Sequence, residues 1–385
     1  MLGRGWKSTV ALAGAMGLLA AALASTTLAQ PSSLGRSPSR SNPIAPDQPD
    51  PSMSAAPPDR AAVVVVLDGA RWQDVLMGVD GELALQAKID PRAANVPTMP
   101  RLAELARRRG AVFGAPGSGT VMSASGPNFV SLPGYTEILG GRPPRGCESN
   151  QCPPTARATL ADDVRAWSDS PREVAVFSSW PDLVRVASNH PASLVVSGGR
   201  SLRYNEPILR EDPVVSDFLD RGAGALSWPG EADFRPDRFT APLAIRYLEI
   251  ARPRFLFLSL GDTDEYAHRG DYANYLEALR FADDAIAKIV DALDRMGERG
   301  RRTTVFVTAD HGRARDFRDH GGKWPESART WLVAIGAGVG SRGAIQGREE
   351  RRLADIAPTA RAWLGMPADS EDDAGRAIAQ LLPAR

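Results

Sequence analysis

The sequence lacks several features that would assign it to a common class of protein. Its 46 basic and 46 acidic residues cancel, so neither a global basic field nor an acidic tail is present. No internal repeat is present. The Gly-x-Ser-x-Gly motif that carries the nucleophile of α/β-hydrolases is also absent. We therefore expect no nucleic-acid polymer as a partner and no serine nucleophile of the α/β-hydrolase kind.

Long hydrophobic runs are missing too, apart from one near the N-terminus. Val10 to Ala24 is an unbroken apolar and small-residue stretch of about 15 residues, whereas a membrane-spanning helix needs ~20. The stretch follows the basic residues Arg4 and Lys7, and small residues precede Gln30, so we predict a secretory signal peptide over residues 1–29. An uncleaved anchor is the alternative, and the absence of a cysteine after the run disfavours a lipoprotein. We expect a periplasmic or secreted chain without a stable membrane anchor.

Cysteine is scarce, with only Cys147 and Cys152 in the chain. In an exported protein this pair predicts a disulfide. The bond would close a short loop, so it would stiffen the chain locally more than it would stabilise the whole fold. A zinc site made by the pair is disfavoured because two further ligands are missing nearby.

The rest of the chain has an ordinary globular composition. Of 385 residues, 43% are hydrophobic and 24% are charged, which is enough for a sizeable core. Residues 30–59 are rich in Pro, Ser, Ala and Gln without periodicity, and they predict a disordered linker. Residues 60–385 are expected to form a single catalytic domain. Helical and strand patterns are both well marked, which favours an α/β fold.

Local patterns predict the individual elements. Apolar runs rich in β-branched and aromatic residues predict strands at 61–67, 174–178, 192–197, 254–260, 303–312 and 331–335. Amphipathic spacing predicts helices at 100–109, 160–167, 240–251, 272–296, 353–364 and 373–382. A loop is expected to run to Pro133, where a Pro-Gly step opens a further helix. Residues 198–240 show no clear pattern.

Acidic residues and histidines gather where predicted strands end. Three such strands lead into carboxylates, and three of the four histidines lie in the same neighbourhoods. These six residues are Asp68, Asp264, Asp310, His268, His311 and His320. Asp264 and His268 are four residues apart, which places both on one face of a helix. Open α/β sheets bind ligands at the carboxyl ends of their strands, so the six side chains predict a site there, whereas His190 is interpreted as a surface residue.

The ligand types indicate the metal. Imidazole and carboxylate together suit zinc, with manganese or iron as alternatives, whereas magnesium and calcium prefer all-oxygen sites. Six ligands in two groups of three suit two ions roughly 3.5–4 Å apart. Ser131 is the candidate nucleophile, since a metal would ionise its hydroxyl without a general base. A helix-capping role is the alternative for Ser131, and Ser123, Ser125 and Thr136 compete for the catalytic role.

These motifs, taken in order, resemble the alkaline phosphatase superfamily over about residues 60–365. The likeness is greatest to the nucleotide pyrophosphatase/phosphodiesterase and single-domain phosphatase branches, whose nucleophile motif is Thr/Ser-x-Pro-Gly/Asn-His-x-x-hydrophobic-x-Thr-Gly. Residues 131–141 match that motif in register, with three departures. Ser131 replaces the commoner Thr, Tyr135 replaces His, and Gly140 replaces Thr. The departures keep a nucleophile but leave the substrate group open.

The resemblance implies a fold and a role for each site residue. The expected fold is a three-layer αβα sandwich around a mostly parallel sheet. One zinc would be held by Asp264, His268 and His320. The other would be held by Asp68, Asp310 and His311, with Ser131 bridging toward the metals as nucleophile. Asn150 lies about where the branch carries an Asn that contacts a substrate oxygen.

The predicted function is therefore that of an exported two-metal hydrolase of phosphate esters, acting through a phospho-enzyme at Ser131. Whether monoesters or diesters are preferred stays open. A sulfatase-like hydrolase is one alternative, although Tyr135 stands where the sulfatase pattern Ser-x-Pro-x-Arg needs its Arg. A phosphoryl or phosphoethanolamine transferase is another, and it would predict a membrane anchor and an acceptor. A non-catalytic binding protein on the same scaffold is the third alternative.

Overall fold

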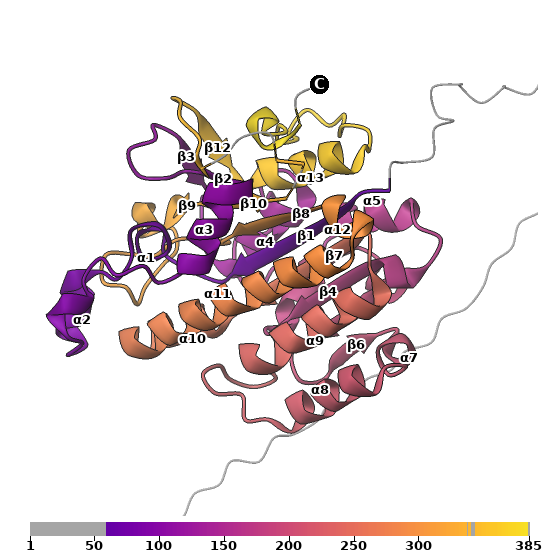
Figure 1. The fold of residues 1–385 in the computed structure, drawn as a ribbon, viewed down its shortest axis with the longest axis horizontal. Coiled ribbons are helices and arrows are strands. Elements are labelled where there is room, and N and C mark those ends of the chain that lie inside the picture. Colours follow the sequence, from indigo (N-terminus) through magenta and orange to yellow (C-terminus); the bar gives the residue numbers. More distant parts are fainter. Residues whose placement is uncertain (1–58, 337, 340–342, 384–385) are drawn as a thin grey trace, which may run out of the picture. The chain divides into compact units, whose positions relative to one another are not determined.

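Hydrophobic strands form the centre of the structure, a computed structural model that describes residues 59–336, 338–339 and 343–383 (Figure 1). The predicted signal peptide and all but the last residue of the predicted linker lie outside these residues. Nine strands form one sheet in the order β11-β2-β10-β8-β1-β7-β4-β5-β6. Their bounds are β1 Ala61–Leu67, β2 Gly110–Phe113, β4 Val174–Ser178, β5 Val195–Gly198, β6 Leu202–Tyr204, β7 Phe255–Leu260, β8 Thr303–Thr308, β10 Leu332–Ile335 and β11 Gly343–Ala344.

The centre of the sheet is parallel. β1 pairs in parallel with β7 on one side and with β8 on the other, and β4 continues the parallel set beyond β7. In this register Leu67 lies beside Leu260, and Val66 lies beside Thr308. The three strands therefore end at the same edge, and the residues that follow them emerge together. The antiparallel pairs lie further out, where β10 joins β8 and β2, and where β6 joins β5.

Helices cover both faces of this sheet. The helices are α1 Trp72–Met77, α2 Gly81–Gln86, α3 Pro100–Arg109, α4 Ser131–Gly140, α5 Leu160–Ala166, α6 Val184–Ala187, α7 Glu206–Leu209, α8 Pro213–Gly224, α9 Asp237–Ala251, α10 Asp262–His268, α11 Tyr272–Arg295, α12 Glu298–Arg301 and α13 Ile356–Leu364. Along β1, Val63 and Val65 pack with α3, α9 and α11, whereas Val64 and Val66 pack with α4, α5 and α13. This alternation follows from the two-residue period of a strand. Figure 1 shows α9 and α11 crossing in front of the sheet, with α4 behind it.

The predicted α/β fold with a mostly parallel sheet between two helical layers is confirmed. A second, three-stranded sheet lies beside the main one and contains β12, β3 and β9 in that order. Its strands are β12 Glu350–Arg352, β3 Val121–Ser123 and β9 Arg329–Thr330. Within the described residues, no helix is both long enough and apolar enough to cross a bilayer.

Three local predictions need correction. The helix expected at 373–382 is absent, and only a 3₁₀ turn at Ala379–Leu381 forms there. The segment instead runs along α13, because Arg376 donates its N–H to Asp355 and Ile378 donates its N–H to Thr359. Tertiary partners thus replaced the helical hydrogen bonds that the local pattern had predicted.

The second correction concerns residues 198–240, which contain β6, α7, α8 and the first turn of α9. The N-terminal signal of α8 was present in the sequence. Asp212 accepts hydrogen bonds from the N–H groups of Val214 and Val215, and Pro213 occupies the first helical position. The hydrophobic spacing that follows is less regular, which explains why the pattern was missed.

The third correction is at the start of α4, which begins at Ser131 rather than at the Pro-Gly step. Pro133 fits inside the first turn because the first N–H groups of a helix have no partner within the helix. Gly134 then donates its N–H to the Val130 carbonyl. Ser131 is therefore the first helical residue, where the peptide dipoles favour negative charge.

A buried carboxylate fastens α3 to α11. Met99, the residue before α3, offers no capping side chain. Asp283 in α11 supplies the cap instead, accepting the N–H of Leu102 at 2.7 Å and that of Arg101 at 3.0 Å. Because the Asp283 side chain is buried, these two hydrogen bonds stabilise the charge of the carboxylate in place of water.

We expect Asp283→Ala to lower the free energy of unfolding by roughly 1–3 kcal/mol, since two helix-end donors lose their acceptor. Urea denaturation of the full chain measures the change. Asp284→Ala is the matched control: that side chain is half-exposed and pairs with Arg101 on the surface, so its loss should cost less than about 0.5 kcal/mol. Equal effects of the two substitutions would contradict the capping role.

Candidate metal centre

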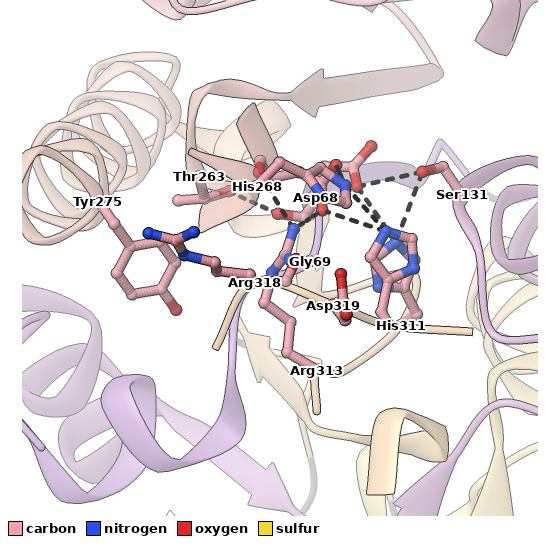
Figure 2. Close-up of polar contacts among 12 residues, drawn as sticks. Asp68, Gly69, Ser131, Thr263, His268, Tyr275, His311, Arg313, Arg318 and Asp319 are labelled. Carbon is pink, nitrogen blue, oxygen red and sulfur yellow. Dashed lines mark hydrogen bonds and ion pairs between the residues drawn. The ribbon is translucent and has the colours of Figure 1, made fainter. Parts of the chain in front are cut away.

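The predicted site residues meet at the edge where β1, β7 and β8 end. Asp68 directly follows β1, and α10, which carries Asp264 and His268, begins one residue after the end of β7. The segment after β8 supplies the remaining ligands, and Ser131 opens α4 from the other side of the same edge. Figure 2 shows Asp68, His268, His311 and Ser131 converging on one region. The parallel register thus brings together side chains that are far apart in the sequence.

The first group consists of Asp264, His268 and His320. The His268 Nε2 atom lies 3.1 Å from Asp264 Oδ2 and 3.0 Å from His320 Nε2. One turn of α10 separates Asp264 from His268, as their spacing predicted. The other ring nitrogen of His320, Nδ1, lies 2.9 Å from the Phe129 carbonyl and donates to it, which leaves Nε2 free to act as a ligand.

The second group surrounds the Ser131 hydroxyl. Its oxygen lies 3.4 Å from Asp68 Oδ1 and 3.4 Å from His311 Nε2. His311 Nε2 in turn lies 3.5 Å from Asp68 Oδ1 and 3.4 Å from Asp310 Oδ2. His311 Nδ1 donates to the Gly312 carbonyl at 2.8 Å, so its Nε2 also carries a free lone pair.

These separations fit a zinc ion. Ligand atoms about 2.0–2.1 Å from a tetrahedral zinc ion lie roughly 3.3–3.4 Å from one another. The four contacts in the second group are all 3.4 to 3.5 Å long. Asp310 also points a buried oxygen, Oδ2, into the group, and this atom accepts no hydrogen bond within the described residues. Its other oxygen accepts the Gly69 N–H at 3.0 Å, so the carboxylate is held with one oxygen free.

Asp264 lies close to both groups. Its carboxylate also comes within 4.8 Å of the donor atoms of Asp68 and His311. The sequence-based division placed Asp264 in the first group alone and Asp310 in the second. The structure brings both residues to the second group, so the two groups form one continuous cluster.

Burial controls the charges of the cluster. Burial, with repulsion from Asp264, raises the pKa of Asp68 to about 7, and burial together with Asp68 also raises the pKa of Asp310. Burial lowers the pKa of His311 to about 4 and that of His320 to about 3, so both rings are neutral, as metal ligands must be. The buried carboxylates repel one another, and the neutral imidazoles supply no positive charge. A bound cation would therefore be stabilised at this cluster.

A buried arginine that the sequence reasoning missed neutralises part of this charge. The guanidinium of Arg313 contacts the Asp264 carboxylate and donates to the carbonyl groups of Phe317 and Arg318. Burial alone would raise the pKa of Asp264, but Arg313 and His268 outweigh it and hold that pKa well below its usual range. The sequence feature that could have indicated Arg313 was its position two residues after His311.

Two further contacts hold the ligand-bearing segments in place. The Asp237 carboxylate accepts the N–H groups of Gly261 and Asp262 at 2.8 and 3.1 Å, which anchors the start of α10. Thr263 donates its hydroxyl to the Asp68 carbonyl at 2.6 Å, which ties α10 to the end of β1. Neither residue was predicted to belong to the site, because both act through the backbone of their neighbours.

The start of α4 packs tightly against the third ligand-bearing segment. A side chain at Gly134 would collide with the Asp310 backbone, so the glycine permits this approach. Asn150 accepts the N–H of Leu132 at 2.9 Å and thereby lies next to Ser131. Asn150 belongs to the loop that Cys147 and Cys152 close, and these two cysteines form the predicted disulfide with an S–S distance of 2.02 Å.

Comparisons with known proteins agree with this picture. Residues 241–368 match the family model of the Metalloenzyme superfamily. The chain is 36% identical over 85 residues to GPI ethanolamine phosphate transferase 1 of Yarrowia lipolytica, an alignment that covers 22% of this chain and 9% of the relative. It is 32% identical over 117 residues to a 2,3-bisphosphoglycerate-independent phosphoglycerate mutase of Synechococcus elongatus, covering 29% and 21%. The chain thus spans less than a quarter of the length of these curated relatives.

Among solved structures, wild-type alkaline phosphatase PafA shares the fold. The TM-score is 0.58 at 12% sequence identity, and the superposition covers 84% of this chain and 98% of PafA. At this level of identity the superposition establishes the shared fold. The family model and the shared fold support membership of the alkaline phosphatase-like superfamily, which confirms the resemblance predicted from the motifs.

We expect His268→Ala and Asp310→Asn each to lower the zinc content of the protein by about one ion per chain, since each substitution removes one ligand of a different group. Elemental analysis after dialysis against buffered zinc measures the stoichiometry. His190→Ala is the control, because that ring lies beside Asn189 on another part of the fold. Full zinc content in both site variants would contradict the assignment of the ligands.

Proposed function

We propose that the protein is an exported two-zinc hydrolase of phosphate esters that works through a phospho-enzyme at Ser131. The observation that carries the proposal is the position of the Ser131 hydroxyl, 3.4 Å from a carboxylate oxygen and 3.4 Å from an imidazole nitrogen of the second ligand group. A hydroxyl in that position would share a cation held by Asp68 and His311. Neither a Ser-His-Asp triad nor a separate general base is needed to activate it.

The reaction has two displacements at phosphorus. Bound zinc would supply Lewis-acid stabilisation of the negative charge that develops on oxygen. In the first step the Ser131 oxygen, having lost its proton to solvent, forms a bond to phosphorus while the bond to the ester oxygen breaks. The departing alcohol takes a proton from solvent. In the second step water attacks phosphorus and gives up a proton to solvent, and the bond to Ser131 breaks. The serine oxygen takes a proton from solvent, and phosphate is released from a monoester or a phosphate monoester from a diester.

The surroundings of Ser131 suit an anionic group. Ser131 is the first residue of the ten-residue helix α4, where peptide dipoles favour negative charge. The side-chain oxygen of Asn150 accepts the Leu132 N–H, which leaves the amide NH₂ group available as a donor near the nucleophile. We infer that this NH₂ group binds a non-bridging oxygen of the substrate.

Transfer to an alcohol instead of water is the second candidate. The likeness to a GPI ethanolamine phosphate transferase over 85 residues favours it. The same phospho-enzyme would form, and an acceptor alcohol would take the place of water in the second step. The disulfide and the predicted signal peptide support export in either case, and manganese is the alternative to zinc.

We expect Ser131→Ala to lower the turnover of p-nitrophenyl phosphate and bis-p-nitrophenyl phosphate by roughly 10³-fold or more, because the nucleophile is lost. Both substrates are assayed on protein of known zinc content, and mass spectrometry of acid-quenched reactions tests for phosphate on Ser131. Ser123→Ala serves as the control, since that serine lies in β3. Full activity of zinc-loaded Ser131→Ala would refute the phospho-enzyme.

We expect Asn150→Asp to raise KM by roughly tenfold or more, because the acceptor for the Leu132 N–H survives while the donor to the substrate is lost. Asn150→Ala removes both functions and should be at least as impaired. Initial rates over a range of substrate concentrations separate KM from kcat. An unchanged KM in Asn150→Asp would limit Asn150 to holding the start of α4.

A further inference from the structure

Tyr135 stands where the nucleophile motif of the resembled family has His, and its larger side chain is completely buried. It lies in α4, one turn after Ser131. Its hydroxyl oxygen is 2.9 Å from Asp68 Oδ2 and 2.7 Å from the Ser259 hydroxyl in β7. One side chain thus connects the nucleophile helix, a metal-ligand candidate and the central sheet.

The chemistry of the partners fixes the direction of these hydrogen bonds. Tyr135 donates its proton to Asp68 Oδ2, so Ser259 must donate to the tyrosine oxygen. The Asp68 carboxylate is therefore held at Oδ2, while its Oδ1 faces Ser131 and His311.

Packing alone accounts for the ring but not for the hydroxyl. The ring meets Phe257 edge to face at a centroid distance of 6.2 Å, and a phenylalanine would make the same contact. A buried hydroxyl costs free energy unless it is hydrogen-bonded. Here both of its neighbours are buried as well, and one of them is a carboxylate of the ligand cluster.

We propose that Tyr135 is a positioning residue that orients Asp68 for binding a cation through Oδ1 alone. By holding Oδ2, the hydroxyl prevents the carboxylate from rotating or from presenting both oxygens. Because α4 carries both Tyr135 and Ser131, the same helix sets the orientation of the ligand and the place of the hydroxyl beside it. The inference rests on the proposed metal centre, but it does not depend on which ester is the substrate.

The test measures zinc affinity without substrate. The full chain is stripped of metal and titrated with zinc in competition with a chromophoric chelator. Tyr135→Phe keeps the ring and removes only the hydroxyl, so we expect zinc at the second ligand group to bind about 10- to 100-fold more weakly, the usual effect of losing such an outer contact. Tyr247→Phe is the matched control, since that buried hydroxyl donates to the Arg172 carbonyl away from the cluster, and its zinc affinity should be unchanged.

A second variant keeps the proposal testable if Tyr135→Phe folds poorly. Ser259→Ala leaves the tyrosine in place and removes its donor, so a smaller loss of zinc affinity is expected. In the double variant Tyr135→Phe/Ser259→Ala, the two losses should not add, because the hydroxyls act in one chain. A lower melting temperature with unchanged zinc affinity in both single variants would reduce Tyr135 to a structural role and overturn the proposal.

The outcomes also separate this inference from the proposed function. If the wild-type chain binds no zinc, the proposed metal centre is refuted. If the wild-type chain binds zinc and Tyr135→Phe leaves the affinity unchanged, only the positioning role of Tyr135 is refuted. Weaker zinc binding in Tyr135→Phe, together with unchanged binding in Tyr247→Phe, would support the inference whatever the activity toward phosphate esters.

Discussion

The repulsion among three closely spaced carboxylates, two of them buried, is the constraint on which the rest of the structure depends. Asp68, Asp264 and Asp310 are brought together by the parallel pairing of β1 with β7 and β8, which ends three strands at one edge. Left uncompensated, such a cluster would destabilise the fold. The protein meets this cost partly with fixed donors, chiefly the Gly69 N–H on Asp310 and the Arg313 guanidinium on Asp264. The remaining negative charge is what a pair of divalent cations would neutralise.

The sequence revealed those parts of the site that depend on local pattern. The strand ending at Asp68 and the helical spacing of Asp264 and His268 could be predicted because each needs only a few neighbouring residues. Arg313 and Asp237 could not be predicted, since their roles arise from contacts with segments about 50 and 25 residues away. The same limit explains the errors in the fold. The segment at 373–382 is shaped by partners on α13, which no periodicity within the segment can indicate.

The similar proteins differ in their reactions more than in their folds. A phosphatase, a phosphoglycerate mutase and an ethanolamine phosphate transferase appear among them. Under the mechanism proposed for this chain, such a difference would need only a change in the group that approaches phosphorus in the second step, because the bound cations and Ser131 would act on the phosphoryl group alike. The walls around Ser131, including the disulfide loop that carries Asn150, are therefore where the choice between water and an alcohol would be made.

The two ligand groups differ in their access to solvent. The His268 side chain is 44% exposed, whereas that of His311 is fully enclosed. An ion in the outer group can exchange with its surroundings through small side-chain motions, but an ion in the inner group can leave only when the backbone around it opens. The inner position would thus preserve the metal acquired during folding, while the outer one would follow the medium. The isolated protein would then hold two different metals, the inner one taken up during folding and the outer one taken from the final buffer.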